Sequence, residues 1–178
     1  KAQKAILKGW SAGCRAVVLQ KVCARDCTFE ADAYVEAAES PEERRAAVEV
    51  RLAANTRAVE VGQSLLARTR KIAAYATSIA GTARSPSPEC MTRMRRDHAE
   101  INAIKVENEG APISLALSMS TPLNLLLGCL DCANDRSTCG EWREDFKNAD
   151  ERLAELRAAI ARDRKILALP APPQPSPK

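Results

Sequence analysis

The side chains with the clearest chemical potential in this chain are its seven cysteines, six of which fall into two groups. The groups are Cys14, Cys23 and Cys27 near the start of the chain, and Cys129, Cys132 and Cys139 late in it. Clustered thiols can form disulfides, hold a metal ion or exchange with other thiols. Any of these uses requires cysteines to lie close together in the folded chain, either within one group or between the two groups.

Disulfides between the two groups are the favoured interpretation. Cys23 and Cys27 lie one helical turn apart, where nearly parallel Cβ vectors make them poor partners for each other. Each is therefore expected to bond to a cysteine of the second group, and a further bond can use Cys14. A bond between the groups closes a loop of about 100 residues and contributes roughly 4–5 kcal/mol in the chain-entropy treatment.

Two other uses of the thiols stay open. Cys23 and Cys27 with Cys129 and Cys132 have the number of thiolates that a structural zinc site needs. The Cys-x-x-Cys spacing of the second pair is also found in thiol-redox proteins, although the strand-helix-strand context of that motif is absent. The prediction remains disulfides, with no metal and no cofactor.

Cys90 is predicted to be unpaired within the chain, or used between chains. It follows the turn at the end of a long helix that leads away from the first cysteine group. In an elongated bundle that position lies far from the other six cysteines.

No residue pattern indicates catalysis, and the chain is predicted not to be an enzyme. His98 is the only histidine, and its neighbours Asp97 and Glu100 favour a surface ion pair. There is no glycine-rich phosphate loop and no Gly-x-Ser-x-Gly nucleophile motif. No small-molecule substrate is evident.

The elements that position these residues are predicted to be helices, so the fold class is all-α. Aromatic residues make up 3% of the chain, glycine is scarce and alanine is abundant, which favours closely packed helices. The expected helices span about 2–27, 30–39, 40–81 and 88–108, then two short helices within 111–130 broken near Thr121-Pro122, and a last helix from about 140.

Start signals and apolar periodicity support the two longest helices. Ser40, Pro41 and Glu43 form the pattern of a capping box. In the helix that follows, apolar residues recur every seven positions at Leu52, Val59, Leu66 and Ala73. In the last helix, a coiled-coil-like seam is predicted from Trp142, Phe146, Ala149, Leu153, Leu156 and Ile160. Trp10, Trp142 and Phe146 are expected to cover the cysteine cluster as core.

The predicted organisation is one domain over residues 1–168 and a disordered proline-rich tail over 169–178. The domain is expected to be an elongated bundle of three to four long helices, cross-linked by disulfides at one end. Residues 111–130 carry no charge, but Pro112 and Pro122 argue against membrane insertion.

The formal net charge of +4 is spread among interleaved acidic and basic residues, which predicts no nucleic-acid binding. The densest basic cluster, Arg93, Arg95 and Arg96, is answered by Asp97 and Glu100.

The functional prediction is a non-enzymatic structural or interaction protein outside the cytoplasm, periplasmic or extracellular, that offers extended helical faces to a protein partner. A secretion-system accessory, an adaptor and an exported inhibitor or immunity protein share this character. Cysteine content supports export, and Lys1 as first residue is expected to follow a removed leader or a trimmed end. Alternatives are a zinc-binding or thiol-redox protein and a basic nucleic-acid or membrane-surface binder. The partner and the oligomeric state are not predicted.

Overall fold

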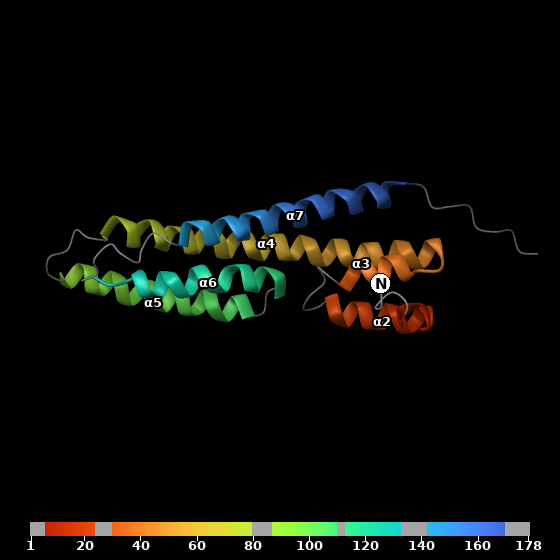
Figure 1. Ribbon diagram of the computed structural model, residues 1–178, viewed down its shortest axis with the longest axis horizontal. Helices are drawn as coiled ribbons and strands as arrows, with labels where there is room; N and C mark the ends of the chain where they lie inside the picture. The colour runs from red at the N-terminus through yellow and green to blue at the C-terminus, as the bar shows by residue number, and fades with distance from the viewer. Residues whose placement is uncertain (1–5, 24–29, 80–86, 110–112, 133–141, 170–178) are drawn as a thin grey trace, which may run out of the picture. The chain divides into compact units, whose positions relative to one another are not determined.

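The computed structural model describes residues 6–23, 30–79, 87–109, 113–132 and 142–169, and these contain helices and connections but no strand (Figure 1). The all-α prediction is therefore confirmed for this part of the chain. A helical turn at residues 6–8 precedes the longer helices. These are α2 (Ala12–Cys23), α3 (Glu30–Ala37), α4 (Pro41–Ile79), α5 (Pro88–Glu109), α6 (Ile113–Cys129) and α7 (Trp142–Ala168).

The chain divides into two compact units. Unit 1 comprises Lys1–Val59 and Glu155–Lys178, and unit 2 comprises Glu60–Ala154. Helices α4 and α7 each contribute residues to both units. A core in unit 1 forms where α2, α3 and the first part of α4 meet, around Leu19, Tyr34 and Val48.

The start of α4 has the serine cap that its sequence predicts. The Ser40 hydroxyl accepts a hydrogen bond from the Glu43 amide at 3.0 Å, and Pro41 occupies the first helical position. The Glu43 carboxylate accepts from the Glu39 amide at 2.9 Å, one residue earlier than a standard capping box. The predicted extent of this helix, 40–81, agrees with α4 within two residues.

The apolar periodicity of the two longest helices marks buried faces. On α4, Val59, Leu66 and Ala73 are buried as expected, and Leu52 is half-buried. The predicted seam on α7 is buried at Phe146, Ala149, Leu153, Leu156 and Ile160. Coiled-coil packing of this seam stays a prediction.

The expectation of one continuous helix over residues 2–27 is wrong. The helix breaks after residue 8, and Ser11 caps the start of α2 by accepting from the amide three residues later at 3.3 Å. At the break the Leu7 carbonyl accepts from the Trp10 amide at 3.1 Å, in a turn and not in a continuing helix. The carbonyls of Leu7 and Trp10 both accept hydrogen bonds from the Arg15 side chain, which adds partners for backbone groups at the break.

Helices α5 and α6 of unit 2 lie side by side as an antiparallel hairpin (Figure 1). Its links, in order from the start of α5 to its end, are Cys90–Cys132, His98–Leu130, Lys105–Asn124 and Asn108–Ala116. Ascending positions on α5 pair with descending positions on and just after α6. This order fixes the direction and the register of the hairpin.

Helix α6 is continuous, so the prediction of two short helices broken near Thr121-Pro122 is also wrong. Pro122 lies inside the helix, where proline costs about 3 kcal/mol. Met119, Leu123 and Leu126 on α6 are fully buried. Burial of three such side chains contributes roughly 1.5–3 kcal/mol each, which outweighs the proline cost.

Among the helices described, none combines the length and the apolar character needed to cross a bilayer. The predicted tail over 169–178 lies, apart from Leu169, outside the described residues.

Candidate functional site

Cys90 forms a disulfide with Cys132, with a Cα–Cα distance of 6.0 Å. The prediction that Cys90 is unpaired is therefore wrong. That prediction placed Cys132 at the opposite end of the bundle, because it expected the second cysteine group to bond to the first, from which the long helix leads away. A single antiparallel α6 instead returns the chain to the start of α5, where Cys90 lies.

The other cysteines differ in environment. Cys23 is buried and disulfide-bonded, Cys14 on α2 is an exposed free thiol, and Cys129 at the end of α6 is buried. Because Cys132 bonds to Cys90, it does not link the two cysteine groups. Cys27 and Cys139, which the remaining predicted links between the groups would use, lie outside the described residues.

The described residues contain no group of three or more histidine, cysteine or acidic side chains placed to hold a metal ion. The four-thiolate zinc alternative also loses two of its ligands as thiolates, because Cys23 and Cys132 are oxidised.

His98 has a structural position instead of the surface ion pair predicted for it. Its Nε2 lies 2.9 Å from the Leu130 carbonyl oxygen. A carbonyl can only accept, so Nε2 carries the proton and donates it to the end of α6. His98 is half-buried and serves as a link of the α5–α6 hairpin.

The basic cluster on α5 is answered by one of the two carboxylates predicted for it, Asp97, whereas Glu100 pairs with an arginine of α4. Arg93 donates to both oxygens of the buried Asp97, at 2.8 and 3.0 Å, and Arg96 lies 3.5 Å from the same carboxylate. Glu100 accepts a hydrogen bond from Arg68 on α4 at 2.7 Å. These contacts use part of the positive charge internally, so the cluster has a structural role.

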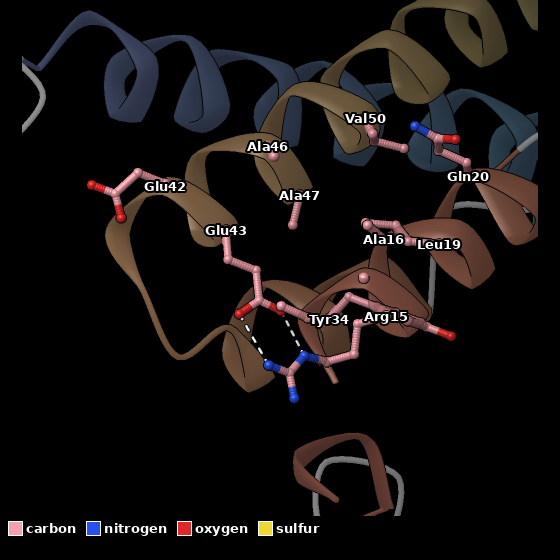
Figure 2. A pocket seen from close by; sticks show the side chains of 12 residues that line it. Arg15, Ala16, Leu19, Gln20, Tyr34, Glu42, Glu43, Ala46, Ala47 and Val50 are labelled. Atoms are coloured by element: carbon pink, nitrogen blue, oxygen red, sulfur yellow. Dashed lines mark hydrogen bonds and ion pairs between the residues drawn. The ribbon is translucent and has the colours of Figure 1, made fainter. Parts of the chain in front are cut away.

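A groove with a volume of about 380 Å³ lies in unit 1 between α2, α3 and the first turns of α4 (Figure 2). We call it the α2–α4 groove. Its walls carry small apolar residues, Ala12, Gly13, Ala16, Ala46, Ala47 and Val50. The small side chains leave the space between these helices open.

Arg15 and Glu43 lie together at one side of the groove (Figure 2). Arg15 Nε donates to Glu43 Oε1 at 2.5 Å, and Nη2 donates to Oε2 at 3.0 Å. Nη1 donates to the carbonyls of Leu7 and Trp10, at 3.0 and 2.6 Å. Every guanidinium nitrogen thus has a partner inside the protein, and Arg15 connects the chain before α2 to the start of α4.

Electrostatics of this pair follow from its hydrogen bonds. The bond from Arg15 lowers the pKa of Glu43 below its usual value, against the opposing effect of burial. The same bond raises the pKa of Arg15. Sequence reasoning identified Glu43 as a capping residue but missed Arg15, which lies 28 positions away in the sequence. The only available signal was a single arginine among apolar neighbours on α2.

A second buried charge pair joins three helices of unit 1. Arg51 on α4 donates through Nε to Asp163 Oδ2 on α7 at 3.0 Å and through Nη2 to Oδ1 of the same residue. Its Nη1 donates to Asp32 on α3. Asp163 is fully buried, whereas Asp32 is exposed. The sequence offered no indication of this pair.

The side of α2 away from the groove exposes apolar residues next to one charged residue. Cys14 and Val17 are exposed there, Val17 at 54%, and the exposed Lys21 follows Val17 by one helical turn. Ala12 and Ala16 are exposed on the groove side. Arg15 and Lys21 are the only charged residues of this helix, and Arg15 is buried. A helix that is apolar around most of its circumference is typical of one covered on more than one side. Trp10, predicted as core, lies 37% exposed beside it.

No protein-family model matches the chain, and no curated protein or solved structure resembles it.

Proposed function

We propose that this protein is a non-enzymatic interaction protein that works outside the cytoplasm and binds a protein partner through helical surface. The observation that carries this proposal is the exposed apolar surface of α2, Cys14 and Val17, next to the α2–α4 groove. Solvent-facing apolar surface of this kind is stabilised when a second protein covers it.

The disposition of charged groups supports a binding role over catalysis. Arg15 with Glu43 and Arg51 with Asp163 are internal pairs that connect helices. Charged side chains that pair with each other inside the protein hold its helices together. Helices held in this way offer rigid surfaces to a protein partner. In this proposal, the bundle of long helices is the scaffold that offers these surfaces.

The compartment is inferred from sulfur chemistry. Cys90 and Cys132 are joined, and Cys23 is disulfide-bonded too. Disulfides persist in oxidising compartments such as the periplasm or the cell exterior and are rare in the cytosol. We therefore propose that the protein is exported and works in a periplasmic or extracellular setting.

The binding role is tested by affinity capture with the full, oxidised chain from an extract of the cells that produce it. We expect a protein partner to be retained by the native chain and lost with Val17→Lys, which puts a charge on the outward face of α2. Val106→Lys on α5 is the matched control, because Val106 is also exposed, at 68%. Background proteins alone, with turnover in an enzymatic screen, would refute the proposal.

The compartment is tested on the protein isolated with its thiols blocked at lysis. Peptide mapping without reduction should recover the fragments containing Cys90 and Cys132 as one linked species. Recovery of both as blocked thiols would contradict an oxidising compartment.

A further inference from the structure

We propose that the α2–α4 groove binds an amphipathic helix of the partner protein, which inserts a bulky apolar side chain between α2 and α4 and places a lysine or arginine beside Glu42. This inference rests on the proposed function and specifies its surface and the chemistry of its partner.

The shape of the groove calls for bulk from the partner. Its walls are formed by small residues such as Ala16 on α2 and Ala46 on α4, both exposed. A volume of about 380 Å³ lies within the range of sites that bind organic groups. Leu19 and Tyr34 close the inner side, so an entering side chain is surrounded by apolar atoms.

The neighbouring elements favour a helix as the occupant. The groove lies between helices, whose backbone hydrogen bonds are made internally, and no strand edge occurs in the described residues to pair with an extended peptide. A groove between helices is the usual receptor for the apolar face of an amphipathic helix.

The charge of the groove lining determines which charge the partner helix should carry. Arg15, Glu42 and Glu43 are the charged residues of the groove. Arg15 and Glu43 neutralise each other, whereas Glu42 is exposed and has no ion pair among the described residues. The uncompensated charge is therefore negative and lies at one end of the groove (Figure 2). A basic residue at the edge of the docked helix complements it.

The first experiment locates the contact with a photo-cross-linker. Gln20→benzoylphenylalanine places the probe on an exposed lining residue, and Ala67→benzoylphenylalanine places it on an exposed position of α4 outside the lining. After irradiation of the full oxidised chain in the cell extract, mass spectrometry identifies the linked peptide. We expect the Gln20 probe to select one segment with apolar residues at three- and four-residue spacing and a flanking lysine or arginine.

The second experiment measures affinity for a synthetic peptide of that segment by fluorescence anisotropy. Ala16→Phe fills the groove and should weaken binding at least about 10-fold, the equivalent of one buried side chain. Ala53→Phe, at an exposed alanine of α4 outside the lining, is the control and should bind normally. Circular dichroism melting shows whether each variant is folded.

A charge exchange tests the basic residue. Glu42→Lys should weaken the basic peptide about 2–5-fold, as expected for an exposed charge pair, and a peptide with glutamate at that position should regain the loss. Glu60→Lys makes the same change at an exposed position of α4 outside the groove and should have no effect. This arm remains interpretable if Ala16→Phe fails to fold.

Several outcomes overturn the inference. They are a segment linked through Gln20 that is acidic or extended, linkage to a second copy of this chain, equal linkage from both probes, and affinity unchanged by Ala16→Phe and Glu42→Lys. If a partner is captured and lost with Val17→Lys but is indifferent to the groove variants, the proposed function stands and this inference fails. If no partner is captured at all, both fail.

Discussion

The buried pair between Arg51 and Asp163 gives the most direct test of how unit 1 is held together. The Asp163 side chain is 1% exposed and that of Arg51 is 13% exposed, and two hydrogen bonds join them between α4 and α7. Asp163→Leu removes the acceptor and leaves the guanidinium with Asp32, which is 68% exposed. The charge of Arg51 then lies in a largely dehydrated position with one solvated partner.

Removing one member of a buried ion pair typically costs 3–5 kcal/mol. Asp32 remains and Arg51 has some access to water, so the low end applies, and we expect a loss of about 3 kcal/mol in the free energy of unfolding. The double variant Arg51→Met/Asp163→Leu should lie close to the native protein, since an apolar pair of similar size replaces a buried ion pair at little cost. Asp32→Asn should cost under about 1 kcal/mol, as exposed pairs do.

The assay is urea unfolding followed by far-ultraviolet circular dichroism, with the four proteins of the double-mutant cycle compared at one pH and salt concentration. Arg51→Met leaves Asp163 buried without its partner and should also cost at least about 3 kcal/mol, so a coupling of about 6 kcal/mol is expected between positions 51 and 163. The reasoning is refuted if Asp163→Leu costs less than about 1 kcal/mol, or if the double variant is as unstable as the sum of the two single variants.

Three further predictions concern local features of the fold. Joint replacement of Cys90 and Cys132 by serine should lower stability by about 4 kcal/mol, the chain-entropy value for a link across 42 positions, and unchanged thermal melting would contradict the disulfide. Ser40→Ala should cost about 1 kcal/mol through loss of the α4 cap, measured by urea unfolding, whereas Ser40→Asp should retain most of the stability. For Glu43, the pKa is lower in the folded state than in the unfolded state, because Arg15 donates to the carboxylate. The stability that ionised Glu43 contributes is therefore fully present above the ordinary glutamate pKa of about 4.3. It is lost as the pH falls through the lower pKa of the folded state. The stability difference between the native protein and Glu43→Gln should be constant from pH 7 to about 5 and shrink below about 4, and a difference independent of pH would count against the ion pair.

Features encoded within a few neighbouring residues were predictable from sequence. The cap at Ser40, the extent of α4 and the buried seam of α7 follow from local hydrogen bonding and from the 3.6-residue period of the helix. The break before α2 was equally local, since Gly9 ends one helical segment and Ser11, two positions later, caps the next. The prediction of a continuous helix overlooked both residues.

Contacts between distant residues were not predictable in the same way. The link between Cys90 and Cys132 depends on α6 running through Pro122 as one helix that returns antiparallel to α5. Burial of the apolar side of α6 favours the single helix. In that arrangement His98 lies against the end of α6 and not among surface charges.

The sequence by itself determined that the chain is helical, where its longest helices begin and which of their faces are buried, because these properties depend on residues within one or two helical turns. Tertiary structure alone decided that Arg15 meets Glu43, that Arg51 meets Asp163 and that small residues of α2 and α4 line a groove. Such meetings depend on the lengths, breaks and directions of whole helices, and no short stretch of sequence contains that information.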